Sequence, residues 1–141
     1  MRPTKKKTHL YFCGTFRTAS SKAFNLDLEK RFKAEGLTCF LPQLHSDQSG
    51  DRSRTFKEDI AGIDGAECVV AIGRELQSAN WGFEVGYCYA KGIPIIGLTD
   101  KDHPFDLMTS GAIKDFIVRE DLEPIDDYFM DLLKLVKKFL I

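Results

Sequence analysis

Two acidic side chains in this sequence have the spacing and surroundings to act together on a glycosidic bond. Glu84 follows a buried apolar run and a polar loop, in the segment SANWGFEVGY. Asp59 lies before that apolar run, in the segment TFKEDIAGID. Paired carboxylates cleave glycosidic bonds by dividing the work between a nucleophile and an acid–base group. The pattern predicts such a pair, and the simpler alternatives are a helix-stabilising Glu84 and a surface-charged Asp59.

The surroundings of Glu84 favour the chemical interpretation. We expect a helix over residues 82–91 with this carboxylate in its first turn, where the helix dipole keeps an acid ionised at neutral pH. Gly82 and Gly86 remove bulk on either side, and apolar residues flank the acid directly. An acid placed only to compensate the dipole would more often lie on a solvated, charged face.

The residues after the first apolar run form a second candidate site. Gly14, Thr15, Arg17, Ser20 and Ser21 supply backbone amides, hydroxyl groups and a guanidinium within eight positions. Such groups bind phosphate when they surround a helix N-terminus. An ordinary turn and helix cap with one exposed arginine is an equally good interpretation.

The elements that must position these residues alternate between strand and helix. Apolar runs predict strands, and apolar residues three or four apart predict helices. The predicted strands are residues 9–13, 37–41, 68–72, 94–98 and 116–118, and the predicted helices are residues 20–35, 55–63, 82–91 and 125–140. This alternation predicts an α/β three-layer sandwich, flavodoxin-like or Rossmann-like, with a five-stranded parallel sheet. Ligands of such sheets bind beyond the carboxyl ends of the strands.

Length and composition restrict the kind of protein. The chain has 141 residues with a formal net charge of -1, which fits one domain and argues against a general binder of nucleic-acid polymers. We expect a basic tail over residues 1–7 and a single domain over residues 8–141. No apolar stretch approaches the ~20 residues of a membrane span, and the basic start lacks the apolar region of a secretory signal. We therefore expect a cytoplasmic protein that does not bind membranes.

No cofactor or metal is expected. The sequence has neither a GxGxxG nor a GxxxxGK[ST] motif, and no flavodoxin-style phosphate cradle follows the first strand. The cysteines are widely spaced and do not combine with the histidines at zinc-ligand spacings, so we expect buried, reduced thiols. The four cysteines are Cys13, Cys39, Cys68 and Cys88.

Over residues 8–112 the sequence resembles the nucleoside 2-deoxyribosyltransferase family. The motifs that carry the resemblance are YFCGTFR, FKEDIAGIDGAECVVAI and GFEVGYCYAKGIPIIGL. Members cleave the N-glycosidic bond of 2-deoxynucleosides or their 5′-phosphates. The resemblance implies that Glu84 is the nucleophile, that Tyr11 orients it, and that Asp59 contacts the base and handles its proton.

Two branches of the family differ in the acceptor of the sugar. Six positions before Glu84, the transferases similar to this chain carry Asp, whereas the chain has Ser78, as in the 2′-deoxynucleoside 5′-phosphate N-hydrolases. Arg17 with the amides around Gly14 and Thr15 also resembles the hydrolase loop near the phosphate. We therefore expect a hydrolase that acts on 5′-monophosphates through a covalent intermediate on the nucleophile. The alternatives are a base-exchanging transferase and a catalytically silent nucleotide sensor.

The resemblance also implies a homodimer or higher homo-oligomer with a shared active site. The residue contributed by the neighbouring subunit aligns with Asp106, or with Ser110 or Thr109 if the register shifts. Trp81 is a candidate for the wall of the sugar or base pocket, or for a core or lid position. Gln43 is a candidate hydrogen-bonding partner of the base.

Overall fold

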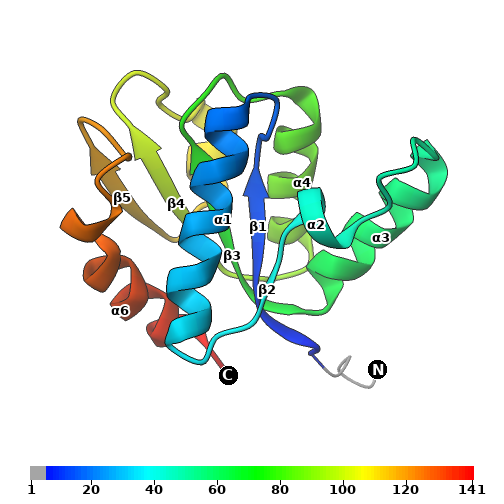
Figure 1. Cartoon of the computed structure of the whole chain (residues 1–141), viewed down its shortest axis with the longest axis horizontal. Helices are drawn as coiled ribbons and strands as arrows, with labels where there is room; N and C mark the ends of the chain where they lie inside the picture. Colours follow the sequence, from blue (N-terminus) through cyan, green and yellow to red (C-terminus); the bar gives the residue numbers. More distant parts are fainter. Residues whose placement is uncertain (1–5) are drawn as a thin grey trace.

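The computed structural model describes residues 6–141, and its centre is one parallel β-sheet (Figure 1). Residues 1–5 of the predicted tail lie outside the described part. The strands are β1 (Thr8–Gly14), β2 (Cys39–Phe40), β3 (Ala66–Gly73), β4 (Ile95–Asp100) and β5 (Asp115–Arg119). The predicted α/β class and five-stranded parallel sheet are confirmed.

The strand order fixes where a ligand can bind. The order is β2-β1-β3-β4-β5, so the chain steps outward from β1 to β2 and then returns to build the other half of the sheet. In doubly wound sheets with this order, the crevice lies between the carboxyl ends of β1 and β3, where the direction of winding reverses. Residues 14–17 and 73–78 follow these two ends.

Alternation along β1 divides its side chains between two cores. Leu10 and Phe12 belong to one buried cluster, whereas Tyr11 and Cys13 belong to the other. Successive side chains of a strand point to opposite faces of the sheet, so this division follows from the pleat. Tyr11 therefore points to the face on which Glu84 is carried.

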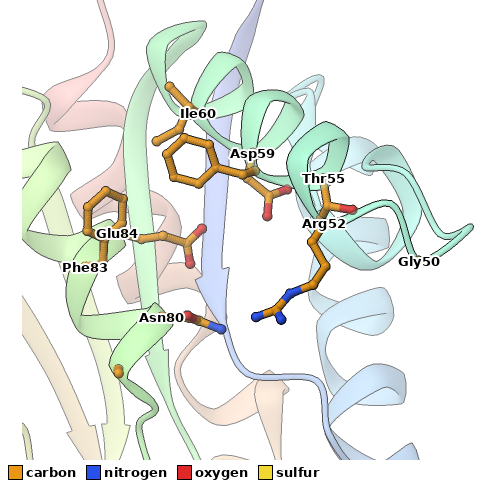
Figure 2. A pocket seen from close by; sticks show the side chains of 10 residues that line it. Gly50, Arg52, Thr55, Asp59, Ile60, Asn80, Phe83 and Glu84 are labelled. Carbon is orange, nitrogen blue, oxygen red and sulfur yellow. The ribbon is translucent and has the colours of Figure 1, made fainter.

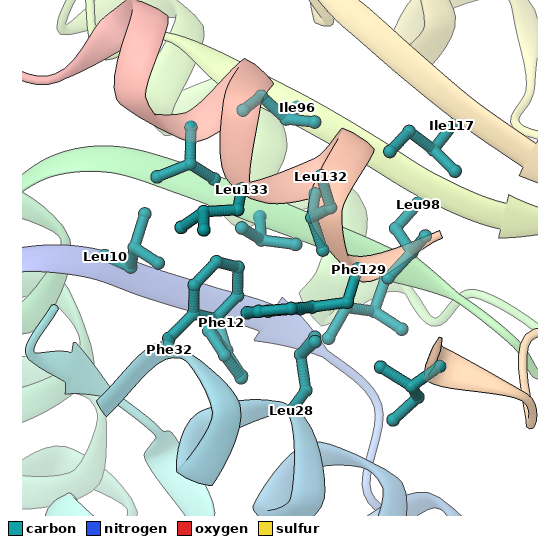
Figure 3. Close-up of a cluster of buried hydrophobic side chains, with 14 of the residues drawn as sticks. Leu10, Phe12, Leu28, Phe32, Ile96, Leu98, Ile117, Phe129, Leu132 and Leu133 are labelled. Atoms are coloured by element: carbon teal, nitrogen blue, oxygen red, sulfur yellow. The ribbon is translucent and has the colours of Figure 1, made fainter. Parts of the chain in front are cut away.

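The first cluster joins two helices to one face of the sheet. Helix α1 (Ala19–Ala34) and helix α6 (Phe129–Phe139) pack there, with Phe32 and Phe129 in edge contact at 5.2 Å between ring centroids (Figure 3). Helix α1 ends before Gly36, whose φ of 81° is in the left-handed region that glycine adopts without strain. The short helix η1 (Ile125–Asp127) leads into α6.

The opposite face is covered by α4 (Ala79–Ala90), which begins earlier than predicted. Ser78 caps it, because the Ser78 hydroxyl accepts a hydrogen bond from the Trp81 amide at 3.2 Å. Helix α3 (Arg52–Asp64) also begins earlier, at the cap Asp51. Both predicted helix starts were too late by three residues, since each rested on apolar spacing and ignored the capping residue. In Figure 1, α3 and the loop before it extend away from the body of the sheet.

Two further short helices occur where loops were predicted. They are α2 (Pro42–His45) and α5 (Leu107–Ala112). Lys6 and Lys7, the described end of the predicted tail, contact the turn after α3, through the carbonyl oxygens of Asp64 and Gly65. Within residues 6–141, no helix is long and apolar enough to cross a membrane.

Candidate active site

Glu84 of α4 and Tyr11 of β1 meet on the face of the sheet that α4 covers. Tyr11 is fully buried, and its hydroxyl donates a hydrogen bond to Glu84 Oε1. The thiol of Cys13 lies 3.9 Å from the other carboxylate oxygen. Burial, followed by the negative charge of Glu84, raises the pKa of Tyr11, so its hydroxyl remains a proton donor. The predicted orienting contact is therefore present in the fold.

Glu84 differs from the prediction in its place on the helix and in its charge. It is the sixth residue of α4 rather than a first-turn residue, because the helix begins at Ala79. The dipole effect fades after the first turn. Burial raises the pKa of Glu84 to about 7, and the charge of Asp59 acts in the same direction. The expectation that the dipole keeps this acid fully ionised is wrong, because burial decides its titration.

Asp59 is half-buried and is held by the loop before α3. The hydroxyl of Ser46, a buried residue, donates a hydrogen bond to Asp59 Oδ1. Burial raises the pKa of Asp59, and the charge of Glu58 adds to this effect against the opposing hydrogen bond. A carboxyl group with a raised pKa retains its proton closer to neutrality, which is what a general acid requires.

Both carboxylates line the same two adjoining cavities. The larger has a volume of about 510 Å³ and the smaller about 310 Å³. Thr55, Asp59, Asn80 and Glu84 line both, so these four side chains stand where the cavities meet. Figure 2 shows the two carboxylates pointing into the larger cavity from α3 and α4.

The larger cavity combines an aromatic surface with one cation. Phe56 from α3 and Phe83 from α4 line it, with ring centroids 6.1 Å apart, although each is more than half exposed. Ile60 adds a further apolar surface. The guanidinium of Arg52 points into the same space, towards Asn80 (Figure 2). This cavity can accept a flat, polar-edged ring.

The smaller cavity holds most of the predicted phosphate-binding residues. Gly14, Thr15 and Arg17 line it from the loop after β1, and Ser78 and Trp81 line it from the start of α4. Trp81 is only 3% exposed, and its indole nitrogen donates to the Cys13 carbonyl at 3.0 Å. Trp81 is therefore a fixed wall of the cavity and a core residue at once.

Four predicted residues lie elsewhere in the single chain. The carboxamide of Gln43 is engaged by α1, where Asn25 donates to it at 3.0 Å and the Lys22 carbonyl accepts from it. Gly82 lines a different cavity, between α4 and α5. Asp106 is the residue before α5 and makes no side-chain capping hydrogen bond, and the Ser110 hydroxyl donates to the Phe105 carbonyl at 3.1 Å. Contact of Asp106 or Ser110 with a partner's site stays a prediction.

Several lining residues were not anticipated. They include Arg52, Thr55, Phe56, Ile60 and Asn80, together with Ser46 as the partner of Asp59. Arg52, Thr55 and Phe56 precede Asp59 on α3 by seven, four and three residues, and Ile60 follows Phe56 by four. That helical spacing, counted from the capping residue Asp51, was a usable signal. The contact with Ser46 had none, since it depends on how the loop folds back.

All four cysteines are free thiols. Cys13, Cys68 and Cys88 are buried as expected, whereas Cys39 is only half-buried. Burial raises the pKa of Cys68 and Cys88 to about 12, so both remain protonated. Among residues 6–141, no group of three or more potential metal-binding side chains is clustered.

Comparison with known proteins places the chain in a class. The sequence model of the nucleoside 2-deoxyribosyltransferase family matches residues 10–127. A conserved protein from Enterococcus faecalis V583 is similar in structure, with a TM-score of 0.74 and 22% identity over 94% of this chain and 99% of the other. The 2-deoxyribosyltransferase of Bacillus psychrosaccharolyticus has a TM-score of 0.68 and 20% identity over 89% and 95% of the two chains. Among curated proteins, none matches the sequence.

The chain belongs to the nucleoside 2-deoxyribosyltransferase family, since the family's sequence model matches most of its length. The protein is thus an enzyme of deoxyribosyl transfer or glycosidic cleavage, acting on small nucleoside substrates. The two structural neighbours support the fold.

Proposed function

We propose that the protein hydrolyses the N-glycosidic bond of 2′-deoxynucleoside 5′-monophosphates. The observation that carries the proposal is the convergence of Glu84 and Asp59 at the junction of the two cavities, with Tyr11 hydrogen-bonded to Glu84. The aromatic surface of the larger cavity suits the base, and the hydroxyl and guanidinium groups of the smaller cavity suit the sugar phosphate.

The reaction proceeds in two balanced steps. The Glu84 carboxylate bonds to the anomeric carbon while the bond to the base nitrogen breaks, and its electron pair leaves with the base. Asp59 supplies the proton that the departing base requires. Water then attacks the anomeric carbon, the ester bond breaks with its electrons returning to Glu84, and the water proton passes to Asp59.

Tyr11 positions the nucleophile and adjusts its basicity. Its hydrogen bond lowers the pKa of Glu84 against the effect of burial, so part of the population is ionised at neutral pH. The same bond fixes the direction of the carboxylate. A correctly aimed nucleophile saves much of the entropic cost of reaching the transition state.

Recognition of the phosphate rests on cations that lack a protein partner. Within residues 6–141, neither Arg17 nor Arg52 forms an ion pair. Arg17 lines the smaller cavity beside the hydroxyl groups of Thr15 and Ser78. A guanidinium and hydroxyl donors together match the acceptors of a phosphate.

Base exchange between free 2′-deoxynucleosides is the second candidate. It is favoured by the family whose sequence model matches the chain, the nucleoside 2-deoxyribosyltransferases, and by the structural likeness to a 2-deoxyribosyltransferase. The two activities share the covalent step and differ only in the acceptor.

A substrate panel decides between them. Deoxynucleosides and their 5′-monophosphates are incubated with the protein, with and without an acceptor base, and the products are separated chromatographically. Free base and deoxyribose 5-phosphate without acceptor support the hydrolase. Base exchange restricted to unphosphorylated nucleosides contradicts the hydrolase and supports the transferase. Absence of turnover by the wild type contradicts both enzymes and supports a catalytically silent nucleotide sensor.

We also propose that two copies associate through the α4–α5 surface. Leu107 and Met108 are 86% and 82% exposed beside a cavity of about 400 Å³ that Gly82 and Gly86 also line. Exposed apolar groups of this size are typical of contact surfaces. Light scattering should give at least a dimer for the wild type and a monomer for Leu107→Asp, and a monomeric wild type with full activity contradicts the shared site.

A further inference from the structure

Glu75 places a carboxylate of the chain itself beneath the loop that follows β1. Glu75 Oε2 accepts hydrogen bonds from the Ser21 hydroxyl at 2.5 Å and from the Thr18 hydroxyl at 3.3 Å. Thr18 is the N-cap of α1 and accepts from the Ser21 amide at 3.0 Å. The first turn of α1 is therefore tied to the segment between β3 and α4.

The neighbouring arginine completes this network from the other side. Arg74 donates to the hydroxyls of Ser21 and Ser20, each at 2.9 Å, and pairs with Glu123. The guanidinium also lies 5.0 Å from the centroid of the Phe24 ring, and the Arg74 side chain is only 12% exposed. Ser21 is fully buried, and its hydroxyl donates to the acid while accepting from the arginine.

The charge of Glu75 is maintained by these contacts. Burial acts to raise its pKa, but the hydroxyls of Ser21 and Thr15 and the amide of Arg17 outweigh burial and lower it. A hydrogen-bonded carboxylate of this kind is ionised at neutral pH. The carboxylate thus lies behind the loop in which Thr15 and Arg17 line the smaller cavity, and it is hydrogen-bonded to that loop through Thr18.

We propose that Glu75 is a positioning residue that holds the loop of residues 14–18 in its substrate-binding conformation. Its carboxylate occupies the anion position at the start of α1 and leaves Arg17 free to face the smaller cavity. The 5′ group of the substrate is then recognised by Arg17, Ser78 and the backbone amide of Thr15, and not by the first turn of α1. The inference rests on the proposed function, because it assigns the 5′ group to this cavity.

Because the network contacts the binding loop and not the catalytic side chains, its loss should change KM and leave kcat nearly unchanged. Glu75 touches none of Tyr11, Asp59 and Glu84, which β1, α3 and α4 carry. Glu75→Ala should therefore raise KM for the 5′-monophosphate about tenfold and change kcat little. Acetate has the size of the deleted side chain beyond Cβ, and adding it should lower the KM of Glu75→Ala towards that of the wild type.

The matched control is Glu123→Gln, which removes the exposed partner of Arg74 and keeps Glu75 in place. Its KM should stay near the wild-type value and should not respond to acetate. Formate, which is smaller, should restore Glu75→Ala less well. The proposal is overturned if KM of Glu75→Ala is unchanged. It is also overturned if KM rises and kcat falls by the same factor and acetate restores neither.

A binding readout keeps this test independent of turnover. Acetate should raise the melting temperature of Glu75→Ala and leave that of the wild type unchanged, because only the variant has a vacant carboxylate position. If the wild type turns over no substrate and acetate still stabilises Glu75→Ala selectively, the proposed function fails while the role of Glu75 in the loop stands. If acetate stabilises neither protein, the positioning role is contradicted.

Discussion

The two walls of the candidate active site are built in different ways. The wall at the sheet edge, formed by β1 and α4, carries Tyr11, Trp81 and Glu84. Tyr11 and Trp81 are buried and Glu84 is partly buried, and all three are hydrogen-bonded to one another or to the backbone of β1. The opposite wall is the face of α3 with Arg52 and Phe56, which are exposed and lie on an element that extends from the body of the fold.

This difference indicates a division of labour. A nucleophile requires a fixed position and a low-dielectric environment, which the sheet edge supplies through packing and burial. Recognition of a base or phosphate tolerates more mobile groups, and exposed loops and helix ends commonly supply them. Asp59 joins the two walls, because it lies on α3 and lines both cavities with Glu84 of α4. We therefore expect changes in the sheet-edge wall to alter kcat and changes in the α3 wall to alter KM.

The largest effect is expected at the nucleophile. Glu84→Ala should lower kcat by at least about 10³-fold, because covalent catalysis has no other carboxylate at this position. Product formation under saturating substrate measures the loss, with a circular dichroism spectrum to show that the fold is intact. Glu120→Gln, an exposed acid paired with Lys101, is the control and should be fully active. A Glu84→Ala variant that keeps more than a few per cent of the rate would contradict the role of Glu84 as the nucleophile.

In the same wall, ionisation of Glu84 destabilises the fold, so the free energy of unfolding should depend on pH. Because the pKa of Glu84 is raised from 4.5 to about 7 in the fold, wild-type stability should fall as the pH rises through this window. Glu84→Gln retains an acceptor for Tyr11 and cannot ionise, so at pH 8 it should be more stable by up to about 3 kcal/mol. Near pH 4 the two proteins should be alike. Urea titrations at both pH values give the comparison, and equal stability at pH 8 contradicts the raised pKa.

Substitution of Asp59 should change both the rate of the chemical step and the titration of Glu84. Asp59→Asn should lower kcat about 10²-fold, since it removes the proton donor for the departing base. It should also move the acidic limb of the pH profile of kcat/KM to lower pH, because the charge of Asp59 raises the pKa of Glu84. A limb that stays in place or moves upward contradicts the coupling of the two carboxylates.

Tyr11→Phe should lower the catalytic activity less than substitution of Glu84 or Asp59. Removing a hydrogen bond to a charged group lowers activity about tenfold and should raise the pKa of Glu84, which moves the acidic limb of the pH profile upward. Tyr128→Phe is the matched control, because Tyr128 is equally buried and its hydroxyl donates to the Leu122 carbonyl, away from the site. Equal activity losses in both variants would indicate a general packing effect.

The smallest effect is expected on the exposed wall. Arg52→Gln should raise KM about fivefold with kcat nearly unchanged, as expected for a group that binds substrate and transition state equally. Arg54→Gln is the matched control, because Arg54 lies two positions further on α3 and pairs with Glu58. A fall in kcat for Arg52→Gln, or the same change in KM for both variants, removes the distinction between the walls.

The walls also differ in how well the sequence predicts them. The apolar runs of β1, β3 and β4 predicted the sheet, and the family resemblance predicted the meeting of Tyr11 with Glu84. The position of Glu84 on α4 was missed because Ser78 was not taken as a cap. The α3 wall was largely missed, since the spacing of its residues was not counted from the cap Asp51, and Ser46 reaches Asp59 only through the folding of the loop before α3. Local patterns predict regular elements, whereas loop contacts depend on tertiary packing.

Mass spectrometry of the covalent intermediate tests the central claim most directly. The wild type is mixed with a 2′-deoxynucleoside 5′-monophosphate, quenched in acid during turnover and digested into peptides. We predict a deoxyribosyl 5-phosphate adduct on Glu84 alone, which is absent from Glu84→Ala. Continued turnover without an adduct, or an adduct on another residue, would contradict the assignment of Glu84 as the nucleophile.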